Sequence, residues 1–396
     1  MPRKRAAVAT VPSTRAKKRQ RTSVAEAKED FLVSEKELKD LLQEPEFGGL
    51  EALLTEEKAR YKGAAHWAPE EERLFECLFL RQELGMLPSY WLVDFRGLVV
   101  PDSLFTSSEK RPPIIASMSG KEFHASTALM RLIDLTAEVR TLVQSNKRDK
   151  VPYTIKKTIQ QYITWASKDG GYQHLDYVPN LIVANINADE DADKVVNELQ
   201  WRMYTLARLQ RAFLRVGDNK SLWTKEMRPS PRKTRGQCLV EDFMRESRLK
   251  SDDSPASSKT KTPSKADADA DSDNKPTSTT KTKDSTKASK QTPKTPSPTR
   301  ARSDPQDTND TYRRRPPVVY GLFILRTSVM LLSIDSSKPE PAQVSYHVDI
   351  NLLEYQQSMW NGITIALAVC IARHELVQHL ADFKPAPALD DGDPDA

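Results

Sequence analysis

Two histidines and a glutamate near the C-terminus, His374, Glu375 and His379, come closest to forming a metal site. In a zinc-binding helix two histidines stand four residues apart, so that about one helical turn brings both onto the same face. Here the spacing is five, and the two side chains diverge by about 140° around the helix axis. We therefore expect no zinc site, and we expect these polar side chains to lie on an exposed last turn.

A second pattern, Asp189, Asp191 and Asp193, matches the first positions of a calcium-binding loop. Such a loop needs glycine at its sixth position and glutamate at its twelfth, where this chain has Lys194 and Gln200. The aspartates suit the start of a following helix, where the helix dipole favours negative charge. The sequence thus predicts neither a metal nor a cofactor. The cysteines stand far apart and match no zinc or nucleophile motif; they are Cys77, Cys238 and Cys370.

One pattern does suggest metal-dependent hydrolysis of nucleic acid. Pro101-Asp102 is followed by Ser119-Gly120-Lys121, which stands between an expected strand and an expected helix. The segment from Pro101 to Lys121 and its flanks resembles the PD-(D/E)XK nucleases. The resemblance implies a fold in which an aspartate and a strand carboxylate hold magnesium while the lysine orients a water. Asp102 and Lys121 would then be catalytic, but Ser119 occupies the position of the second carboxylate, so this alternative is a diverged, inactive nuclease fold.

The N-terminal segment 1–22 contains eight Lys/Arg and no acid. Its two compact clusters have the spacing of a bipartite nuclear import signal, in which extended basic segments engage acidic grooves of one receptor. A generic or RNA-binding basic tail is the alternative. We expect import-receptor binding and a nuclear location. The clusters consist of Lys4, Arg5, Lys17, Lys18, Arg19 and Arg21.

Residues 228–315 form a second basic segment, with a net charge of +8 and few apolar residues. Such a composition cannot offset the entropy of ordering, so we expect disorder. Within it, residues 238–244 form either a docking motif or the frayed extension of a helix. Several serines and threonines precede proline, as cell-cycle kinases prefer, although this composition also supplies such pairs by chance. Three have the full Ser/Thr-Pro-x-Lys/Arg form (Ser230, Thr262 and Ser297) and three the shorter one (Ser254, Thr292 and Thr295).

Hydrophobic periodicity and helix-start signals predict a series of helices separated by strands. The helices are expected at 34–42, 50–61, 69–84, 122–143, 152–166, 192–216 and 353–381. The strands are expected at 90–95 (with 98–100 as a continuation), 114–118, 179–186, 318–325, 328–334 and 343–350. This alternation is typical of an α/β layer domain.

The strands and helix that follow the basic segment are too few to be stable alone. We therefore expect an α/β domain with a single mixed sheet and flanking helices, split by a long disordered insertion and preceded by a disordered basic N-terminus. The corresponding organisation is a basic arm (1–30), a first domain part (31–227), a linker (228–315), a second domain part (316–384) and an acidic tail (385–396).

Two stretches, 123–216 and 319–373, are similar to uncharacterised nuclear proteins of filamentous fungi. The residues that carry the similarity include Ala128-Leu129-Met130-Arg131-Leu132, Asp169-Gly170-Gly171 and Trp360-Asn361-Gly362. The similarity implies no activity, because none is known for that group.

The net charge of the chain is +5, so the residues outside 1–22 and 228–315 carry −11. An acidic folded part does not favour a basic nucleic-acid groove, whereas basic tails give salt-sensitive contacts to DNA or RNA. No apolar run is long enough to cross a bilayer, and we expect no membrane span. We expect a non-catalytic nuclear interaction or scaffold protein with unidentified protein partners, regulated by proline-directed phosphorylation.

Overall fold

The computed structural model describes residues 49–61, 63–217, 220–223, 234–252 and 312–385. The basic arm, the helix expected at 34–42, most of the linker and most of the acidic tail lie outside these residues. Among the described residues, none of the helices is long and apolar enough to cross a membrane.

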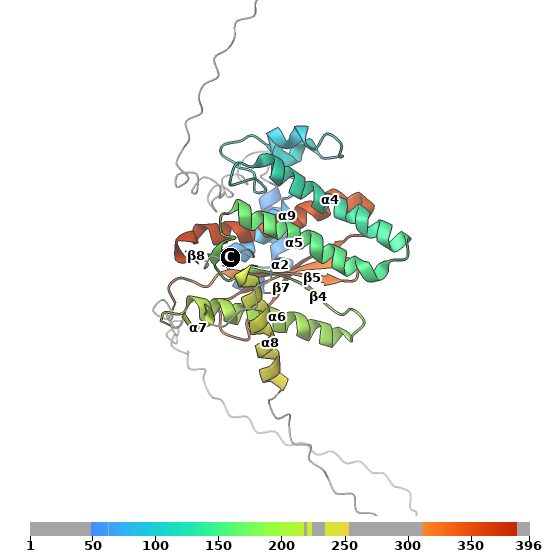
Figure 1. Cartoon of the computed structure of the whole chain (residues 1–396). Helices are drawn as coiled ribbons and strands as arrows, with labels where there is room; N and C mark the ends of the chain where they lie inside the picture. Colours follow the sequence, from blue (N-terminus) through green and yellow to red (C-terminus); the bar gives the residue numbers. More distant parts are fainter. Residues whose placement is uncertain (1–48, 62, 218–219, 224–233, 253–311, 386–396) are drawn as a thin grey trace, which may run out of the picture.

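A four-stranded mixed sheet forms the centre of the fold (Figure 1). Its strands are β4 (Leu181–Asn185), β5 (Val318–Leu325), β6 (Ser328–Asp335) and β7 (Ser345–Asn351), in that order across the sheet. β4 and β5 run parallel, with Leu181 opposite Tyr320, while β5, β6 and β7 are antiparallel to their neighbours. The sheet therefore joins one strand that precedes residue 228 to three strands that follow residue 315.

The expectation of a single sheet is not met in the described residues, because two short two-stranded sheets lie beside the central one. β1 (Leu87–Pro88) pairs in parallel with β2 (Phe105–Thr106), and β3 (Leu175–Asp176) pairs antiparallel with β8 (Lys384–Pro385). The fold class is mixed α/β, but its strands are divided among three sheets.

The strands expected at 90–95 and 114–118 are also wrong. Residues Ser89–Val93 form a 3₁₀ helix, η3, and 114–118 has no regular structure. Trp91 and Phe95 are both buried and stack with ring centroids 6.3 Å apart, whereas Leu92 between them is exposed. A spacing of four between buried residues belongs to a helical turn, and a strand would have buried every second residue.

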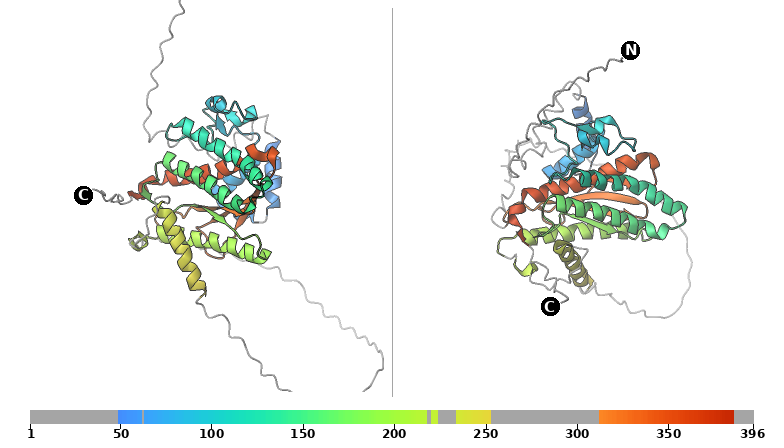
Figure 2. Two further views of the ribbon diagram at one scale, coloured as in Figure 1. Left: turned by 45° about the vertical axis from the view of Figure 1, so that its right-hand side comes forward. Right: turned by 45° about the horizontal axis from the view of Figure 1, so that its top comes forward.

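Helices cover both faces of the central sheet (Figures 1 and 2). α4 (Glu122–Gln144), α5 (Val151–Asp169) and α9 (Ser358–Gln378) pack on one face, and α6 (Ala192–Leu214) and α8 (Arg235–Asp252) lie on the other. Because successive strand residues point to opposite faces, β5 contributes to both cores. Its residues Val318, Tyr320, Leu322 and Ile324 belong to the first hydrophobic cluster, and Val319 and Phe323 belong to the second.

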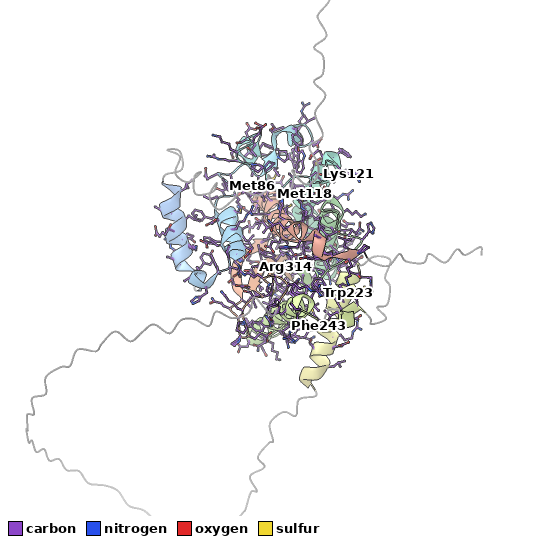
Figure 3. All side chains as sticks on the ribbon, turned by 90° about the vertical axis from the view of Figure 1, so that its left-hand side faces the viewer. Met86, Met118, Lys121, Trp223, Phe243 and Arg314 are labelled. Carbon is purple, nitrogen blue, oxygen red and sulfur yellow. The ribbon has the colours of Figure 1, made fainter. Side chains whose placement is uncertain are left out.

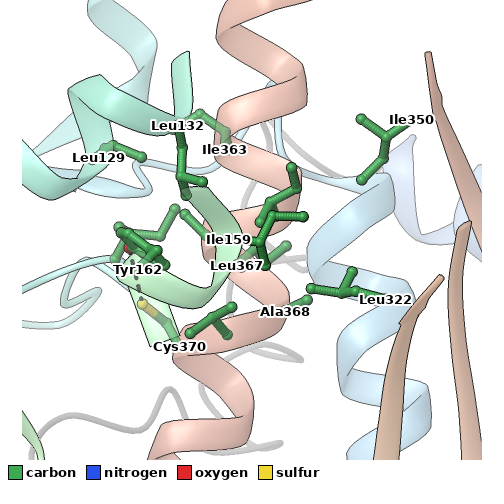
Figure 4. Packing of buried hydrophobic residues seen from close by; sticks show 14 of the residues in the cluster. Leu129, Leu132, Ile159, Tyr162, Leu322, Ile350, Ile363, Leu367, Ala368 and Cys370 are labelled. Atoms are coloured by element: carbon green, nitrogen blue, oxygen red, sulfur yellow. Dashed lines mark hydrogen bonds between the residues drawn. The ribbon is translucent and has the colours of Figure 1, made fainter. Parts of the chain in front are cut away.

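The first core is centred on α9, whose middle is apolar on all sides (Figure 4). Leu367 and Ala368 lie between α5 and the sheet, and both are completely buried. Gly362 lets α9 cross α4 closely, since a Cβ there would lie 2.7 Å from Ile133 Cγ1 and 3.0 Å from the Ile133 backbone nitrogen. Each fully buried Leu or Ile of this cluster contributes roughly 1.5–3 kcal/mol.

Residues 235–252, expected to be disordered, form the helix α8. Thr234 and Gln237 cap its start reciprocally, with Gln237 N donating to Thr234 Oγ1 and Thr234 N donating to Gln237 Oε1. Residues 238–244 are helical, but they belong to this separate helix and are not a frayed extension of α6. Whether they serve as a docking motif stays a prediction. α8 has many charged residues and only a narrow apolar stripe, so its composition alone predicted disorder.

The remaining helices include α2 (Leu50–Arg60), α3 (Pro69–Phe79) and the short α7 (Lys220–Trp223). α2 confirms the sequence expectation, and α3 begins at Pro69 as expected but ends at Phe79 rather than at residue 84. Three acidic residues occupy the first turn of α3. Leu54, Phe75 and Leu80 form a small separate cluster between them. α3 also contacts α9 and β6, so it covers the end of the first core.

Candidate functional site

The last turns of α9 bring three consecutive polar residues, Arg373, His374 and Glu375, into the protein. Arg373 and His374 are buried and Glu375 is partly buried, so the expectation of an exposed last turn is wrong. α4, α5, α3 and the sheet surround α9. Burial lowers the pKa of His374 well below its ordinary value, which keeps the imidazole neutral.

Arg373 forms a fully buried ion pair with Asp169 at the end of α5. The distance from Arg373 Nη1 to Asp169 Oδ2 is 2.5 Å, and both side chains are 1% exposed. Arg373 Nη2 donates to the carbonyl oxygen of Ala116 at 2.9 Å, and its guanidinium lies 5.4 Å from the ring centroid of Trp165. Such a pair is stable only when additional hydrogen bonds satisfy both charges.

Asp169 receives those additional bonds from the segment before α4. The Oγ atoms of Ser117 and Ser119 donate to Asp169 Oδ1 at 2.8 and 2.7 Å. The backbone N–H groups of Met118 and Ser119 donate to Oδ2 and Oδ1 at 2.9 and 3.1 Å. With Arg373, five donors therefore surround one carboxylate, and the arrangement ties residues 117–119 to α5 and α9.

This geometry bears on the nuclease-like pattern. Asp102 begins a short 3₁₀ helix, η4 (Asp102–Leu104), and Lys121 precedes α4; both are exposed, and Figure 3 shows Lys121 near Met118. The strand that should end at Lys121 is absent. The carboxylate that approaches Ser119 is Asp169, which is neutralised by Arg373 rather than left open to a cation. In the described part of the chain, no group of three or more His, Cys, Asp or Glu side chains could hold a metal ion.

Glu375 faces the sheet. Tyr320 of β5 donates its hydroxyl to Glu375 Oε1, and Asn180 Nδ2 donates to Glu375 Oε2 at 3.0 Å and to the carbonyl of Ala372 at 3.1 Å. Burial raises the pKa of Glu375 to about 8, which the two hydrogen bonds oppose and the nearby Glu70 assists. A carboxyl group of this pKa suits proton exchange near neutral pH, but both oxygens already have partners that join β5, α9 and the start of β4.

A second buried polar group lies under α3. Ser333 Oγ donates to Glu71 Oε1 at 2.5 Å and lies 2.8 Å from His347 Nε2. In a catalytic triad the acid would orient the histidine, whereas here the carboxylate bonds to the serine. His347 Nδ1 has no hydrogen-bond partner among the described residues, and burial lowers the pKa of His347 to about 4.

Trp67 covers this Ser333 cluster from outside. Its indole Nε1 donates to Ser345 Oγ at 2.8 Å, and its ring centroid lies 5.7 Å from that of His347. The hydroxyl is thus enclosed and no triad geometry is present. The arrangement fits a hydrogen-bonded core that joins α3 to β6 and β7.

Among the described residues, several large exposed apolar side chains lie on η3 and the first turn of α4. Tyr90, Val93 and Phe123 are 58%, 59% and 69% exposed, and Leu92 is exposed as well. We call these four residues the η3–α4 surface. The sequence showed the apolar residues but assigned three of them to a strand, and so gave no signal that they would face outward together.

Two partly buried hydrogen bonds join η3 and the residue that follows it to α4. Trp91 Nε1 donates to Glu122 Oε2 at 3.0 Å, and Ser126 Oγ donates to Asp94 Oδ2 at 2.5 Å. Arg96 and Lys121 flank the η3–α4 surface and are exposed. Neither side chain has an ion pair within the described residues, so both cations are available at the rim, beside the carboxylates of Glu122 and Asp94.

The import-signal and phosphorylation residues lie outside the described residues. These are Lys4, Arg5, Lys17, Lys18, Arg19 and Arg21, and Ser230, Ser254, Thr262, Thr292, Thr295 and Ser297. Nuclear import and proline-directed phosphorylation therefore stay predictions.

Comparison with family models, with curated proteins and with solved structures gave no match. A function for this fold must therefore be argued from the geometry of the chain itself.

Proposed function

We propose that the chain is a non-catalytic interaction protein of the nucleus, whose α/β body binds a partner protein through the η3–α4 surface. The observation that carries the proposal is the set of large exposed apolar side chains on a segment joined to α4 by two partly buried hydrogen bonds. Exposed apolar clusters rimmed by polar residues are typical of protein interaction sites.

The charge of the rim defines the partner. Arg96 and Lys121 would complement an acidic segment, so the expected partner presents apolar side chains next to aspartate or glutamate. The reactive groups of the body support a non-catalytic role, because Asp169, Glu375 and Ser333 are each hydrogen-bonded to neighbouring elements of the fold.

The basic arm would add the nuclear location and a sequence-independent attraction to phosphate. Eight cations in the segment 1–22 suffice for a salt-dependent contact with DNA or RNA. In this proposal the arm places the protein near chromatin and the η3–α4 surface recruits the partner.

A paired substitution tests the interaction. Leu92→Asp with Phe123→Asp should reduce partner recovery from nuclear extract at least tenfold, because loss of a hot-spot side chain at the centre of an interface costs about 2 kcal/mol or more. Quantitative mass spectrometry of the tagged full chain gives the readout. Tyr153→Asp is the matched control, since Tyr153 is 65% exposed but lies on the first turn of α5, outside this surface.

The control variant should retain the same partners as the unaltered chain, and both variants should melt at the same temperature as it does. Equal recovery by the paired variant would contradict the proposal. Loss of self-association instead, measured by light scattering, would show that the surface binds a second copy.

A further inference from the structure

We infer that the connection between α4 and α5, together with Arg140 and Tyr355, is a binding site for single-stranded nucleic acid. Figures 1 and 2 show this connection at one end of the molecule. α4 has 23 residues, so roughly 30 Å of helix separate the connection from the η3–α4 surface at its other end. The inference therefore does not depend on the function proposed for that surface.

Positive charge is concentrated at this connection. Residues 140–157 contain six Lys/Arg and one acid, Asp149, and carry +5, although the residues outside 1–22 and 228–315 carry −11 in total. Three of these cations, Lys147, Arg148 and Lys150, are exposed, and none of the three forms an ion pair within the described residues. We call them the α4–α5 cations. The acidic total of the body thus conceals a local basic surface.

The local sequence leaves the α4–α5 cations without acidic partners. No Asp or Glu stands three or four positions before or after any of them. Asp149 lies between Arg148 and Lys150, but adjacent side chains do not face each other in a helical turn. Lys147 and Lys150 are three positions apart, where the side chains of a 3₁₀ turn lie one above the other and like charges repel. An anion from outside the chain would relieve this repulsion, and nucleic acids present such anions as phosphate groups.

The backbone holds the α4–α5 cations in fixed positions. α4 ends in a Schellman motif, in which Asn146 has a φ of 56° and its N–H donates to the carbonyl of Val143 at 3.1 Å. The N–H of Lys147 donates to the carbonyl of Leu142 at 2.8 Å, which completes the motif. The 3₁₀ helix η5 (Arg148–Lys150) then leads directly into α5. Because the backbone is ordered before a ligand arrives, binding costs less conformational entropy.

An exposed aromatic ring beside the basic surface selects single strands. Tyr355 is 66% exposed, and the guanidinium of Arg140, in the last turns of α4, lies 4.8 Å from the centroid of its ring. Proteins that bind single strands combine a basic track for phosphates with aromatic rings on which bases stack, and arginine adds a cation–π contribution. The bases of a duplex are stacked on one another and are not available to such a ring. We therefore assign the site to a single strand of RNA or DNA.

Fluorescence anisotropy of the full chain with a fluorescein-labelled strand of about 12 nucleotides, a length typical of single-strand sites, tests the inference. Oligo(U) and oligo(dT) are used in parallel, because RNA and DNA share the phosphate and base chemistry and the ratio of the two affinities distinguishes them. The triple substitution Lys147→Ala, Arg148→Ala and Lys150→Ala should weaken binding at least about tenfold and reduce the log–log salt slope by about 2, since each phosphate contact to a single strand contributes about 0.7. The segment 1–22 is present in every variant, so its own contribution cancels in the comparison.

A matched control removes the same charge elsewhere on the body. The substitutions Lys110→Ala, Lys168→Ala and Lys384→Ala affect exposed lysines outside residues 140–157 and should change the affinity by less than about twofold. Tyr355→Ala should weaken single-strand binding about tenfold without changing the salt slope, and Tyr355→Phe should retain the full affinity. Neither substitution of Tyr355 should alter binding to a duplex of the same length.

Equal losses in the triple variant and its matched control would overturn the inference, because net charge rather than this site would then drive binding. Unchanged affinity of the Tyr355→Ala chain would overturn the assignment to single strands. The inference is also wrong if the triple substitution leaves single-strand binding intact but abolishes binding to phosphatidylserine-containing vesicles or to polyglutamate, since the partner is then a membrane or an acidic protein.

If circular dichroism shows that the triple variant does not fold, acetylation of the unaltered chain replaces it. The bound strand should protect Lys147 and Lys150 from acetylation but should leave Lys168 reactive, as mass spectrometry of the modified peptides measures. Equal protection of the three lysines, or protection of none, overturns the inference.

Discussion

At the scale of single residues, the buried pair Arg373–Asp169 is the contact on which the join between α5, α9 and residues 116–119 depends. Arg373→Ala would leave the Asp169 carboxylate buried without its cation. We expect a loss of about 3–5 kcal/mol in the free energy of unfolding, which is typical when one partner of a buried ion pair is removed. Urea denaturation followed by circular dichroism measures it.

The pair Arg326–Asp189 provides the control, because its side chains are 71% and 82% exposed although the atoms lie 2.8 Å apart. Arg326→Ala should change the free energy of unfolding by only about 0–1 kcal/mol, as surface pairs do. Similar losses in the two variants would mean that the Asp169 carboxylate is not isolated from water as the structure indicates.

The residues at the end of α9 also show what the sequence could predict. Spacing separated His374 from His379 on the helix expected over 353–381, whereas α9 ends at Gln378 and His379 lies just beyond it. It did not reveal burial, although apolar neighbours stand on both sides, at Ile371 and Leu376. Burial there depends on α3, α4 and α5 packing around the helix, and Asp169 is far from Arg373 along the chain. Contacts at such separation follow from the tertiary fold and leave no local pattern.

At the scale of elements, long periodic segments were predictable and short aromatic ones were not. α4, α5, α6 and α9 appear within a few residues of their expected bounds, apart from the first turn of α9, because a buried helical face repeats over several turns. The strand predicted at residues 90–95 was wrong. Aromatic and β-branched residues favour strands locally, but the stacking of Trp91 on Phe95 favours a helical turn. The helix α8 was not predicted because its apolar stripe is only a few residues wide.

The central sheet gives a prediction about separate expression of its two parts. β4 pairs with β5 and with no other described strand, and α4 and α5 pack on α9. Residues 1–252 alone should therefore expose an unpaired strand edge and an uncovered apolar face, and should aggregate. Size-exclusion chromatography and circular dichroism would show it, and a monomer that unfolds cooperatively would contradict it.

The matched control keeps the whole sheet and changes only the connection. Replacing residues 253–311 by a shorter Gly/Ser linker, with α8 and residues 312–385 retained, should leave a single cooperative transition. Halving a flexible loop changes its closure entropy by only about 0.6 kcal/mol. α8 must stay in both proteins, since its loss would expose the second core as well.

At the scale of the whole molecule, part of the positive charge of residues 228–315 belongs to folded elements of the structure. Arg314 and Arg315 belong to the body, where they pair with Asp382 at 3.0 Å and Asp335 at 3.1 Å. α8 contains four basic and four acidic residues. Residues 253–311 are left with eleven Lys/Arg and nine Asp/Glu. This segment is far less basic than the net charge of +8 suggested, so the strongest attraction to phosphate shifts to the N-terminal segment 1–22.

DNA binding by the full chain should accordingly depend on that arm. Binding to a short duplex, followed by anisotropy at about 50 and about 200 mM salt, should weaken steeply with salt, with a limiting log–log slope of about −7 if all eight cations contact phosphate. Deleting the segment 1–22 should remove most of the affinity and most of the slope.

Phosphates on Thr262 and Ser297 would add a charge of about −3 to −4. This would make residues 253–311 acidic but would not cancel the charge of the segment 1–22, so kinase treatment should weaken DNA binding less than the deletion does. If deleting the segment 1–22 leaves the affinity for DNA unchanged while phosphorylation abolishes it, the DNA contact belongs to residues 253–311 instead.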